Sequence, residues 1–343
     1  MKLFYFKLYN FIFNLFKGLR KNYTYEKIKF AFYICILFCI IAIYKYEDFC
    51  LKCINKIQNK KCFNCKASII FQNLKIYDDD TTLDEIIHKN KSISRFGDGE
   101  FYFMSGNNIF FQAYNKEMAQ RLINIVNSRE KNLLIGINLP YKSKFLNRFN
   151  LNAKNYFKKF IDHFKFILSK IFKNNEYYSS TISRFYIDIK SKKNVKKYIK
   201  KLKKIWEKRD IVIVEGEKSR LGIGNNLFVN SNSIQRIICP VTNAFNRYQE
   251  IINIIKNKVN KDKLILIALG PTATVLSFDL CKLGYQALDI GHIDIEYEWY
   301  LRKAKNKIPI KNKYVCERRN SQLPFTNVSD INYWKQIIAK IID

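Results

Sequence analysis

The sequence predicts an α/β protein with a mainly parallel sheet that has helices on both faces. Short aliphatic and β-branched runs recur along the chain, and most are followed by a polar loop and then by helical spacing of apolar residues. This alternation is typical of Rossmann-like folds, in which a helix connects each strand to the next. Ligands of such sheets bind beyond the carboxyl ends of the strands, where the polar loops of this chain also lie.

The strand signal is strongest in six segments, which are residues 93–96, 133–137, 211–214, 234–239, 264–268 and 286–290. Helical spacing is clearest at residues 118–125 and 195–206. A further helix is expected to start after Gly270-Pro271, because Pro suits the first helical turn, and to end at Gly284. We expect these elements to form one main domain at residues 76–335.

The N-terminal part predicts a membrane-anchor segment ahead of the main domain. Residues 1–27 mix aromatic and aliphatic residues with basic ones, which indicates an amphipathic segment at a membrane surface. Residues 30–44 are 15 residues without a charge. If the side chains of Lys29 and Lys45 reach the two interfaces, residues 28–46 give 19 residues, close to the ~20 that span a bilayer. We predict a membrane anchor at residues 28–46, with a buried core helix as the alternative.

A linker with four cysteines is expected at residues 47–75. Two C-x2-C pairs resemble the ligand pairs of a small zinc site, although the gap between the pairs is shorter than usual. The alternative is free or disulfide-paired cysteines. The four residues are Cys50, Cys53, Cys62 and Cys65.

The formal net charge is +32, which by itself would suggest nucleic acid or an anionic membrane as a partner. Lysine supplies 48 of the 61 basic residues, and glycine is scarce, as expected from an A/T-rich coding sequence. Much of the charge is therefore expected on solvated faces. The chain also lacks an aromatic-basic recognition motif, so we do not expect a nucleic-acid partner.

The strand at 264–268 runs directly into a predicted helix N-terminus. Free backbone N–H groups and the helix dipole favour an anion there, so a phosphate is expected beside Gly270, Thr272 and Ala273. The next strand ends in the sequence GHIDIE at 291–296, which places carboxylates after a strand, as in a divalent-metal site.

Three motifs carry a family resemblance. They are SRFGDGEF at 94–101, VEGEKSRLGIGNNLF at 214–228 and GPTATVLSFDLCKLGYQALDIGHIDIEYEW at 270–299. With these motifs in the same order, the chain resembles the GT-D fold glycosyltransferases over roughly residues 80–330. The resemblance implies a GT-D type domain, glycosyl transfer and an Asp-x-Glu metal motif.

Two Asp-x-Glu triplets are candidates for that metal motif. We predict that Asp294 and Glu296 hold Mn or Mg, because they neighbour the expected phosphate site, and that His292 is a further ligand, a diphosphate contact or a structural residue. Asp98 and Glu100 are the rival metal pair, and otherwise bind hydroxyls of the donor or activate the acceptor. Their alternative is purely structural, with Asp98 as a helix cap.

Further donor contacts are expected in the first two motifs. Arg95 and Gly97 flank the first acidic triplet. The second motif places charged and hydroxyl groups directly after a strand, where Lys and Arg would offset diphosphate charge. A solvated charge cluster is the alternative reading of this group, which is Glu217, Lys218, Ser219 and Arg220.

These observations predict a membrane-associated, metal-dependent glycosyltransferase. It would transfer a hexose from a UDP-sugar to a surface glycan, a glycolipid or a glycoprotein. We expect its catalytic domain to face the cytoplasm, with a lumen as the alternative. The alternative is a catalytically silent glycan- or membrane-binding protein on the same fold.

Overall fold

The computed structural model describes residues 74–138, 146–173, 176–326, 328 and 330–342. By its internal contacts the chain divides into residues 1–66 and 67–343, and all described residues belong to the second unit. The predicted amphipathic segment, the predicted anchor and the four linker cysteines lie outside the described residues. No helix in the described ranges has the length and apolar character needed to cross a membrane.

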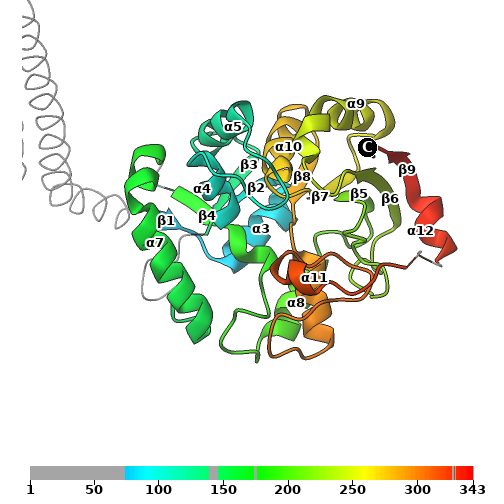
Figure 1. Ribbon diagram of the computed structural model, residues 1–343. Helices are drawn as coiled ribbons and strands as arrows, with labels where there is room; N and C mark the ends of the chain where they lie inside the picture. The colour runs from blue at the N-terminus through cyan, green and yellow to red at the C-terminus, as the bar shows by residue number, and fades with distance from the viewer. Residues whose placement is uncertain (1–73, 139–145, 174–175, 327, 329, 343) are drawn as a thin grey trace, which may run out of the picture. The chain divides into compact units, whose positions relative to one another are not determined.

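A parallel sheet of nine strands forms the centre of the described domain, in the order β1-β4-β3-β2-β8-β7-β5-β6-β9 (Figure 1). The strands are β1 (Lys75–Ile76), β2 (Ser92–Phe96), β3 (Leu133–Ile137), β4 (Glu176–Ser179), β5 (Asp210–Gly216), β6 (Ser233–Cys239), β7 (Leu264–Ala268), β8 (Gln286–Asp289) and β9 (Ile337–Lys340). All strand pairs in this sheet are parallel. The prediction of a mainly parallel sheet is therefore confirmed. Strand β1 begins one residue before the expected domain of residues 76–335, and β9 lies after it.

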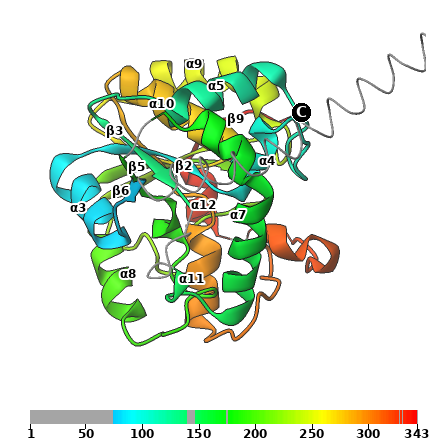
Figure 2. The same cartoon turned by 90° about the vertical axis from the view of Figure 1, so that its left-hand side faces the viewer.

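Helices cover both faces of the sheet, as predicted. The α-helices are α3 (Asp79–Lys89), α4 (Asp98–Met104), α5 (Lys116–Val126), α7 (Leu151–Ile171), α8 (Val195–Lys203), α9 (Tyr248–Lys258), α10 (Pro271–Lys282), α11 (Ile293–Leu301) and α12 (Ile331–Gln336). Three short 3-10 helices are η1 (Ser180–Ser183), η2 (Ala244–Arg247) and η3 (Cys316–Ser321). In both ribbon views α5, α9 and α10 lie on one side of the sheet, and α8 and α11 lie on the other (Figures 1 and 2).

The central strands are buried because their residues are apolar on both faces. Residues 211–214 and 264–267 are fully buried, which is the pattern of parallel strands covered on both sides. On the side of α8 and α11, Trp206 and Trp299 fill the core. Their indole N–H groups donate to the carbonyls of Leu227 and Ile308, so the burial of both rings leaves no donor unsatisfied.

Candidate functional site

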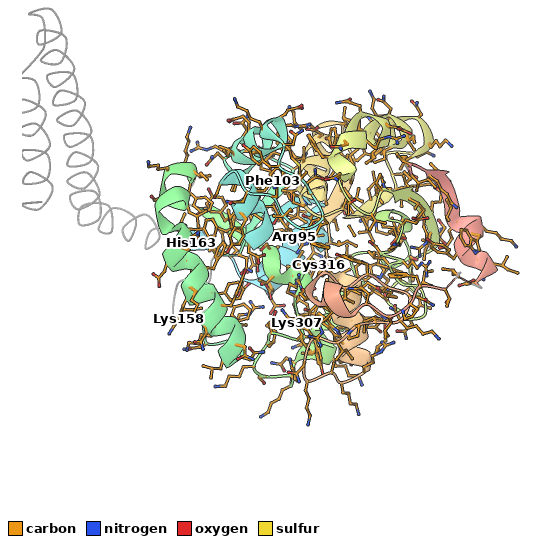
Figure 3. The ribbon with its side chains drawn as sticks, in the orientation of Figure 1. Arg95, Phe103, Lys158, His163, Lys307 and Cys316 are labelled. Atoms are coloured by element: carbon orange, nitrogen blue, oxygen red, sulfur yellow. The ribbon has the colours of Figure 1, made fainter. Side chains whose placement is uncertain are left out.

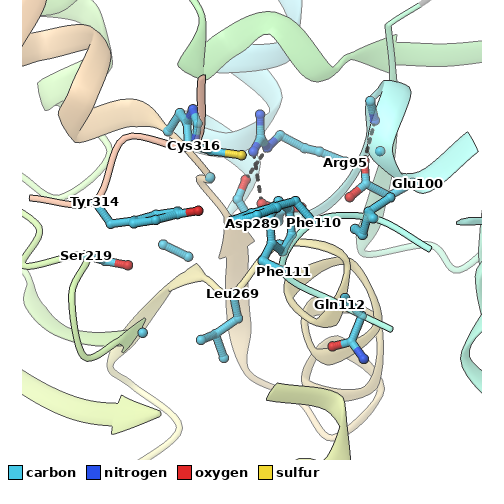
Figure 4. Close-up of a pocket in the computed structure, with 18 of the residues that line it drawn as sticks. Arg95, Glu100, Phe110, Phe111, Gln112, Ser219, Leu269, Asp289, Tyr314 and Cys316 are labelled. Atoms are coloured by element: carbon cyan, nitrogen blue, oxygen red, sulfur yellow. Dashed lines mark hydrogen bonds and ion pairs between the residues drawn. The ribbon is translucent and has the colours of Figure 1, made fainter. Parts of the chain in front are cut away.

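A pocket of about 590 Å³ lies at the carboxyl ends of β2, β5, β7 and β8. Each of the three sequence motifs contributes to its lining, for example through Glu100, Ser219 and Gly270. Figure 4 shows Ser219 and Tyr314 on one side of the pocket and Phe110 and Phe111 on another. Parallel topology brings these distant segments together, because the carboxyl ends of all the strands meet at one edge of the sheet.

Arg95 and Asp289 form an ion pair at the pocket wall. The guanidinium NH2 group of Arg95 lies 3.0 Å from Oδ1 of Asp289, and its Nε donates to the backbone carbonyl of Asp289 at 2.6 Å. Its NH1 group donates to the carbonyl of Ser180 and the hydroxyl of Ser183. Arg95 lines the pocket, as predicted, but most of its N–H groups hold β2, β8 and η1 together.

Asp98 and Glu100 line the same pocket at the start of α4. Oε2 of Glu100 accepts a hydrogen bond from the backbone N–H of Gly97 at 2.7 Å, which caps this helix. Asp98 is exposed and accepts a hydrogen bond from the hydroxyl of Tyr156 on α7. Burial and the nearby carboxylate of Asp289 raise the pKa of Glu100 from 4.5 to about 7.

Asp294 lines the pocket but is bound within the protein. It lies in the first turn of α11, and its Oδ2 accepts from Nζ of the buried Lys313 at 2.5 Å. Its Oδ1 accepts from the backbone N–H of Gly222 at 2.9 Å and from the side-chain amide of Asn225 at 2.8 Å. The carboxylate therefore joins α11 to the loop of the second motif.

Glu296 has different partners, although it is only two residues from Asp294. It is fully buried, and its Oε2 accepts from the backbone N–H groups of Tyr186 and Ile187, each at 2.9 Å. Asp294 therefore contacts Lys313 and the loop of the second motif, whereas Glu296 contacts the backbone of residues 186 and 187. With these separate partners, metal binding by Asp294 and Glu296 together stays a prediction.

The predicted phosphate site is only partly open to the pocket. Of its three residues, Gly270 lines the pocket, whereas the side chains of Thr272 and Ala273 are fully buried. A Cβ atom on Gly270 would lie 2.2 Å from Cε2 of Phe111, so this ring packs directly against the start of α10. A phosphate at this N-terminus would share its space with Phe111.

Of the predicted donor contacts in the second motif, only Ser219 lines the pocket. The charged residues of this group lie outside the pocket lining. Lys218 and Arg220 lie over the ring of Phe325, with centroid distances of 5.4 Å and 5.5 Å. Arg220 also donates to the carbonyl of Thr326 at 3.0 Å. Glu217 is exposed and, like Lys218 and Arg220, is not among the residues that line the pocket.

Sequence reasoning missed three charged residues of the pocket, Asp289, Arg184 and Glu317. NH1 of Arg184 lies 2.6 Å from Oε1 of Glu317 and 3.8 Å from Oε1 of Glu296. Nδ1 of the predicted site residue His292 lies 3.3 Å from the same oxygen of Glu317. A charged residue at the end of a buried strand was an available signal for Asp289, whereas Arg184 follows a short 3-10 helix without a periodic pattern.

Comparison with known families agrees with this architecture. The profile of the family described as "Glycosyltransferase GT-D fold" matches residues 93–318, which include all three motifs. The chain belongs to the GT-D glycosyltransferase family. The family resemblance predicted from the motifs is thus confirmed.

Two curated relatives of this GT-D chain are streptococcal. "Glycosyltransferase GlyD" of Streptococcus pneumoniae is 41% identical over 265 residues, which cover 77% of this chain and 32% of the relative. "Probable glycosyl transferase Gly" of Streptococcus gordonii is 39% identical over 262 residues, which cover 76% of this chain and 38% of the relative. The chain therefore spans only about a third of the length of these relatives.

Solved structures give the same fold. A structure titled "The highly conserved domain of unknown function 1792 has a distinct glycosyltransferase fold" has a TM-score of 0.75 and 36% identity, covering 81% of this chain and 99% of the solved one. "A New Glycosyltransferase (DUF1792) from Streptococcus sanguinis" has a TM-score of 0.74 and 36% identity, covering 78% and 99%. The GT-D domain thus accounts for nearly the whole of each solved chain.

The pocket of this GT-D domain is acidic within a basic chain. Its lining carries five carboxylates, two arginines and no lysine. Three carboxylates pair with cations, namely Asp289 with Arg95, Asp294 with Lys313 and Glu317 with Arg184. Asp98 and Glu100 form no ion pair with any cation in the described residues.

The remaining pair, Asp98 and Glu100, fits a divalent cation that is completed by a ligand. Within the described ranges, no three or more His, Cys, Asp or Glu residues gather closely enough to hold a metal ion. Mg²⁺, however, is commonly bound through one or two carboxylates together with substrate phosphates and water. Two carboxylates that line a pocket and lack a cationic partner meet this smaller requirement.

Proposed function

We propose that this chain is a metal-dependent glycosyltransferase that transfers a hexose from a UDP-sugar to a surface glycan, a glycolipid or a glycoprotein. The observation that carries the proposal is the pair Asp98 and Glu100, two pocket carboxylates without a cation in a GT-D domain. The names of the relatives state glycosyl transfer alone. The uridine nucleotide, the hexose and the metal therefore belong to the proposal.

The charges of the pocket and of the donor support the proposal of a bound metal ion. A nucleoside diphosphate sugar carries two negative charges on its diphosphate, and five carboxylates outnumber two arginines in the pocket lining. Like charges in a partly buried site repel each other strongly because the effective dielectric constant is low. A divalent ion held by Asp98 and Glu100 would offset this repulsion and would stabilise the charge of the leaving diphosphate.

The remaining walls of the pocket suit the other parts of such a donor. Phe110, Phe111 and Leu269 provide an apolar side that can cover a nucleoside and exclude water. Arg184 and His292 lie on the pocket wall, where they can donate hydrogen bonds to phosphate oxygens. Asp289 is held in place by Arg95, and its carboxylate adds a fixed acceptor for donor hydroxyl groups.

Turnover of a donor panel tests the proposal. The purified chain is incubated with several nucleotide sugars and Mn²⁺, and release of the nucleoside diphosphate is measured. We expect release from a UDP-hexose that stops on addition of EDTA and falls at least a hundredfold in Asp98→Asn and Glu100→Gln. Glu217→Gln is the matched control, because Glu217 is an exposed carboxylate outside the pocket lining, and it should retain activity.

Two results would contradict the proposal. Equal turnover with Mn²⁺ and with EDTA would remove the metal from the reaction. Binding of a glycan without turnover of any donor would instead identify a catalytically silent glycan-binding protein.

We also propose that residues 28–46 attach the chain to a membrane and that the catalytic domain faces the cytoplasm. Nucleotide sugars are made in the cytoplasm, which favours this side, and the apolar sequence of the segment supports attachment. Protease added to sealed vesicles with the cytoplasmic side inward should leave residues 70–343 uncut. Cleavage of this domain without detergent would place it on the other side.

A further inference from the structure

Two segments that are far apart in the sequence form one basic face of the domain. The first is residues 190–204, which contain α8, and the second is residues 302–311, which follow α11. Nζ of Lys307 lies 3.2 Å from Oδ2 of Asp188, two residues before the first segment, so the second segment lies beside the chain that leads into the first. Both lie on the side of the sheet opposite α5, α9 and α10 (Figures 1 and 2), and Figure 3 shows long side chains that extend from this end near Lys307.

Most cations of this face are turned toward solvent. Lys201 and Lys307 pair with carboxylates of the domain. Ten other lysines of the two segments are exposed, and none of them pairs with a carboxylate of the described residues. One of the ten, Lys192, donates to the backbone carbonyls of Tyr186 and Ile187. We call the other nine residues the basic face, and they are Lys190, Lys193, Lys196, Lys197, Lys200, Lys204, Lys303, Lys305 and Lys311.

Two exposed aliphatic side chains lie in segments that adjoin this face. Leu301 is 45% exposed at the end of α11, next to Arg302 and Lys303, and Val229 is 73% exposed. The loop of Val229 is tied to α8 and α11, because Nζ of Lys203 donates to the carbonyl of Asn226 at 2.6 Å and the hydroxyl of Tyr297 donates to its side chain. Valine and leucine among lysines suit a lipid headgroup layer, whereas faces for single-stranded nucleic acid present aromatic rings.

We propose that the basic face binds an anionic phospholipid bilayer. Helix α8 buries Val195, Ile199 and Leu202 in the core and directs its lysines outward, so its charges can reach headgroups without unfolding. Lysine is abundant throughout the chain, so charge alone does not single out this face. Two further observations single out this face, namely the exposed side chains of Val229 and Leu301 and the ion pair that holds Lys307 beside the start of the first segment. The inference does not depend on the donor or the metal proposed above.

Vesicle binding by residues 67–343 tests the inference without the apolar segment 28–46. This unit matches solved chains that consist almost entirely of the GT-D domain, so it is expected to fold alone. It should sediment with vesicles of equal parts phosphatidylcholine and phosphatidylglycerol but not with phosphatidylcholine vesicles. Binding should fall steeply with salt, because the Debye length shrinks from about 10 Å at 0.1 M to about 3 Å at 1 M. Equal binding to both kinds of vesicle would overturn the inference.

A matched pair of variants separates the basic face from net charge. Lys→Gln at Lys193, Lys197, Lys303 and Lys305 should weaken binding to anionic vesicles about fivefold for each lysine. The control makes the same charge change at the exposed residues Lys116, Lys131, Lys256 and Lys282, outside the basic face. Equal losses in both variants would show that only net charge matters and would overturn the inference. Turnover of a soluble donor should be unchanged in both variants. A failure of the membrane-binding inference can therefore be told apart from a failure of the proposed glycosyl transfer.

The aliphatic pair separates a bilayer from a nucleic acid. Val229→Ser with Leu301→Ser should weaken vesicle binding several-fold while leaving any binding to duplex RNA unchanged. If vesicle binding is unaffected and RNA displaces the vesicles, the face is a nucleic-acid surface and the inference is wrong.

Discussion

Arg95 binds Asp289 at two points, the carboxylate at 3.0 Å and the backbone carbonyl at 2.6 Å. The two residues belong to the neighbouring strands β2 and β8, and both line the pocket. A guanidinium that holds the backbone as well as the side chain fixes the position of the carboxylate. Gly291 leaves the space for this guanidinium, because a Cβ atom there would lie 2.1 Å from NH2 of Arg95.

Gly291→Ala should therefore displace Arg95 from Asp289. The glycine also has a φ of +45°, which an alanine adopts at a cost. We expect the free energy of unfolding to fall by about 1–3 kcal/mol and donor turnover to fall at least tenfold. Gly99→Ala is the control for stability, since nothing lies within 4 Å of a Cβ there. Stability equal to that of Gly99→Ala in urea unfolding, together with donor hydrolysis equal to that of the wild type, would refute this role of Gly291.

Asp294→Asn should lower the free energy of unfolding but leave Mn²⁺ binding largely intact. The change leaves the charge of buried Lys313 with Glu298, at 3.1 Å, as its remaining ion-pair partner. Removing one partner of a buried ion pair typically costs about 3 kcal/mol or more. Urea unfolding should show a loss of that order, and Asp98→Asn, at an exposed residue, should change stability little. A fully stable Asp294→Asn protein that has lost Mn²⁺ binding would restore Asp294 as the metal ligand.

Glu296 should make stability depend on pH. Burial raises its pKa from 4.5 to about 7, although Arg184 and two backbone N–H groups oppose the shift. The pKa of Glu296 is higher in the folded state than in the unfolded state. Its protonated carboxyl therefore stabilises the fold fully below about pH 4.5, and this stabilisation is lost as the pH rises through about 7. The free energy of unfolding should fall by about 3 kcal/mol across this range relative to Glu296→Gln. Parallel pH profiles for wild type and Glu296→Gln would contradict this, and Glu217→Gln serves as the exposed control.

The strands were predictable because their apolar runs are long and bounded by polar turns. Residues 133–137 and 264–268 match β3 and β7. The edge strands β1 and β9 and their short neighbour β4 were not predicted, because these strands are short, less buried and lack such runs. Parallel pairing in the centre of the sheet follows from the alternation of strands and helices, which is readable in one sequence.

The site was only partly predictable. Glycine-bounded turns correctly marked Asp98 and Glu100 as pocket residues. The direction of Asp294 and Glu296 depends on α11 beginning at Ile293, and periodicity does not locate a helix start to one residue. The sequence also gives no signal that the ring of Phe111 packs against Gly270, because that contact joins two distant loops.

Titration calorimetry of UDP tests the central claim, that Asp98 and Glu100 bind the donor through a metal. The account predicts tight binding of UDP by the wild-type chain with Mn²⁺ and weak binding with EDTA. Asp98→Asn and Glu100→Gln should bind UDP weakly in both conditions, whereas a folded Asp294→Asn protein should keep the Mn²⁺ dependence. Equal affinity for UDP with Mn²⁺ and with EDTA in the wild-type chain, or full Mn²⁺ dependence in Asp98→Asn and Glu100→Gln, would contradict it.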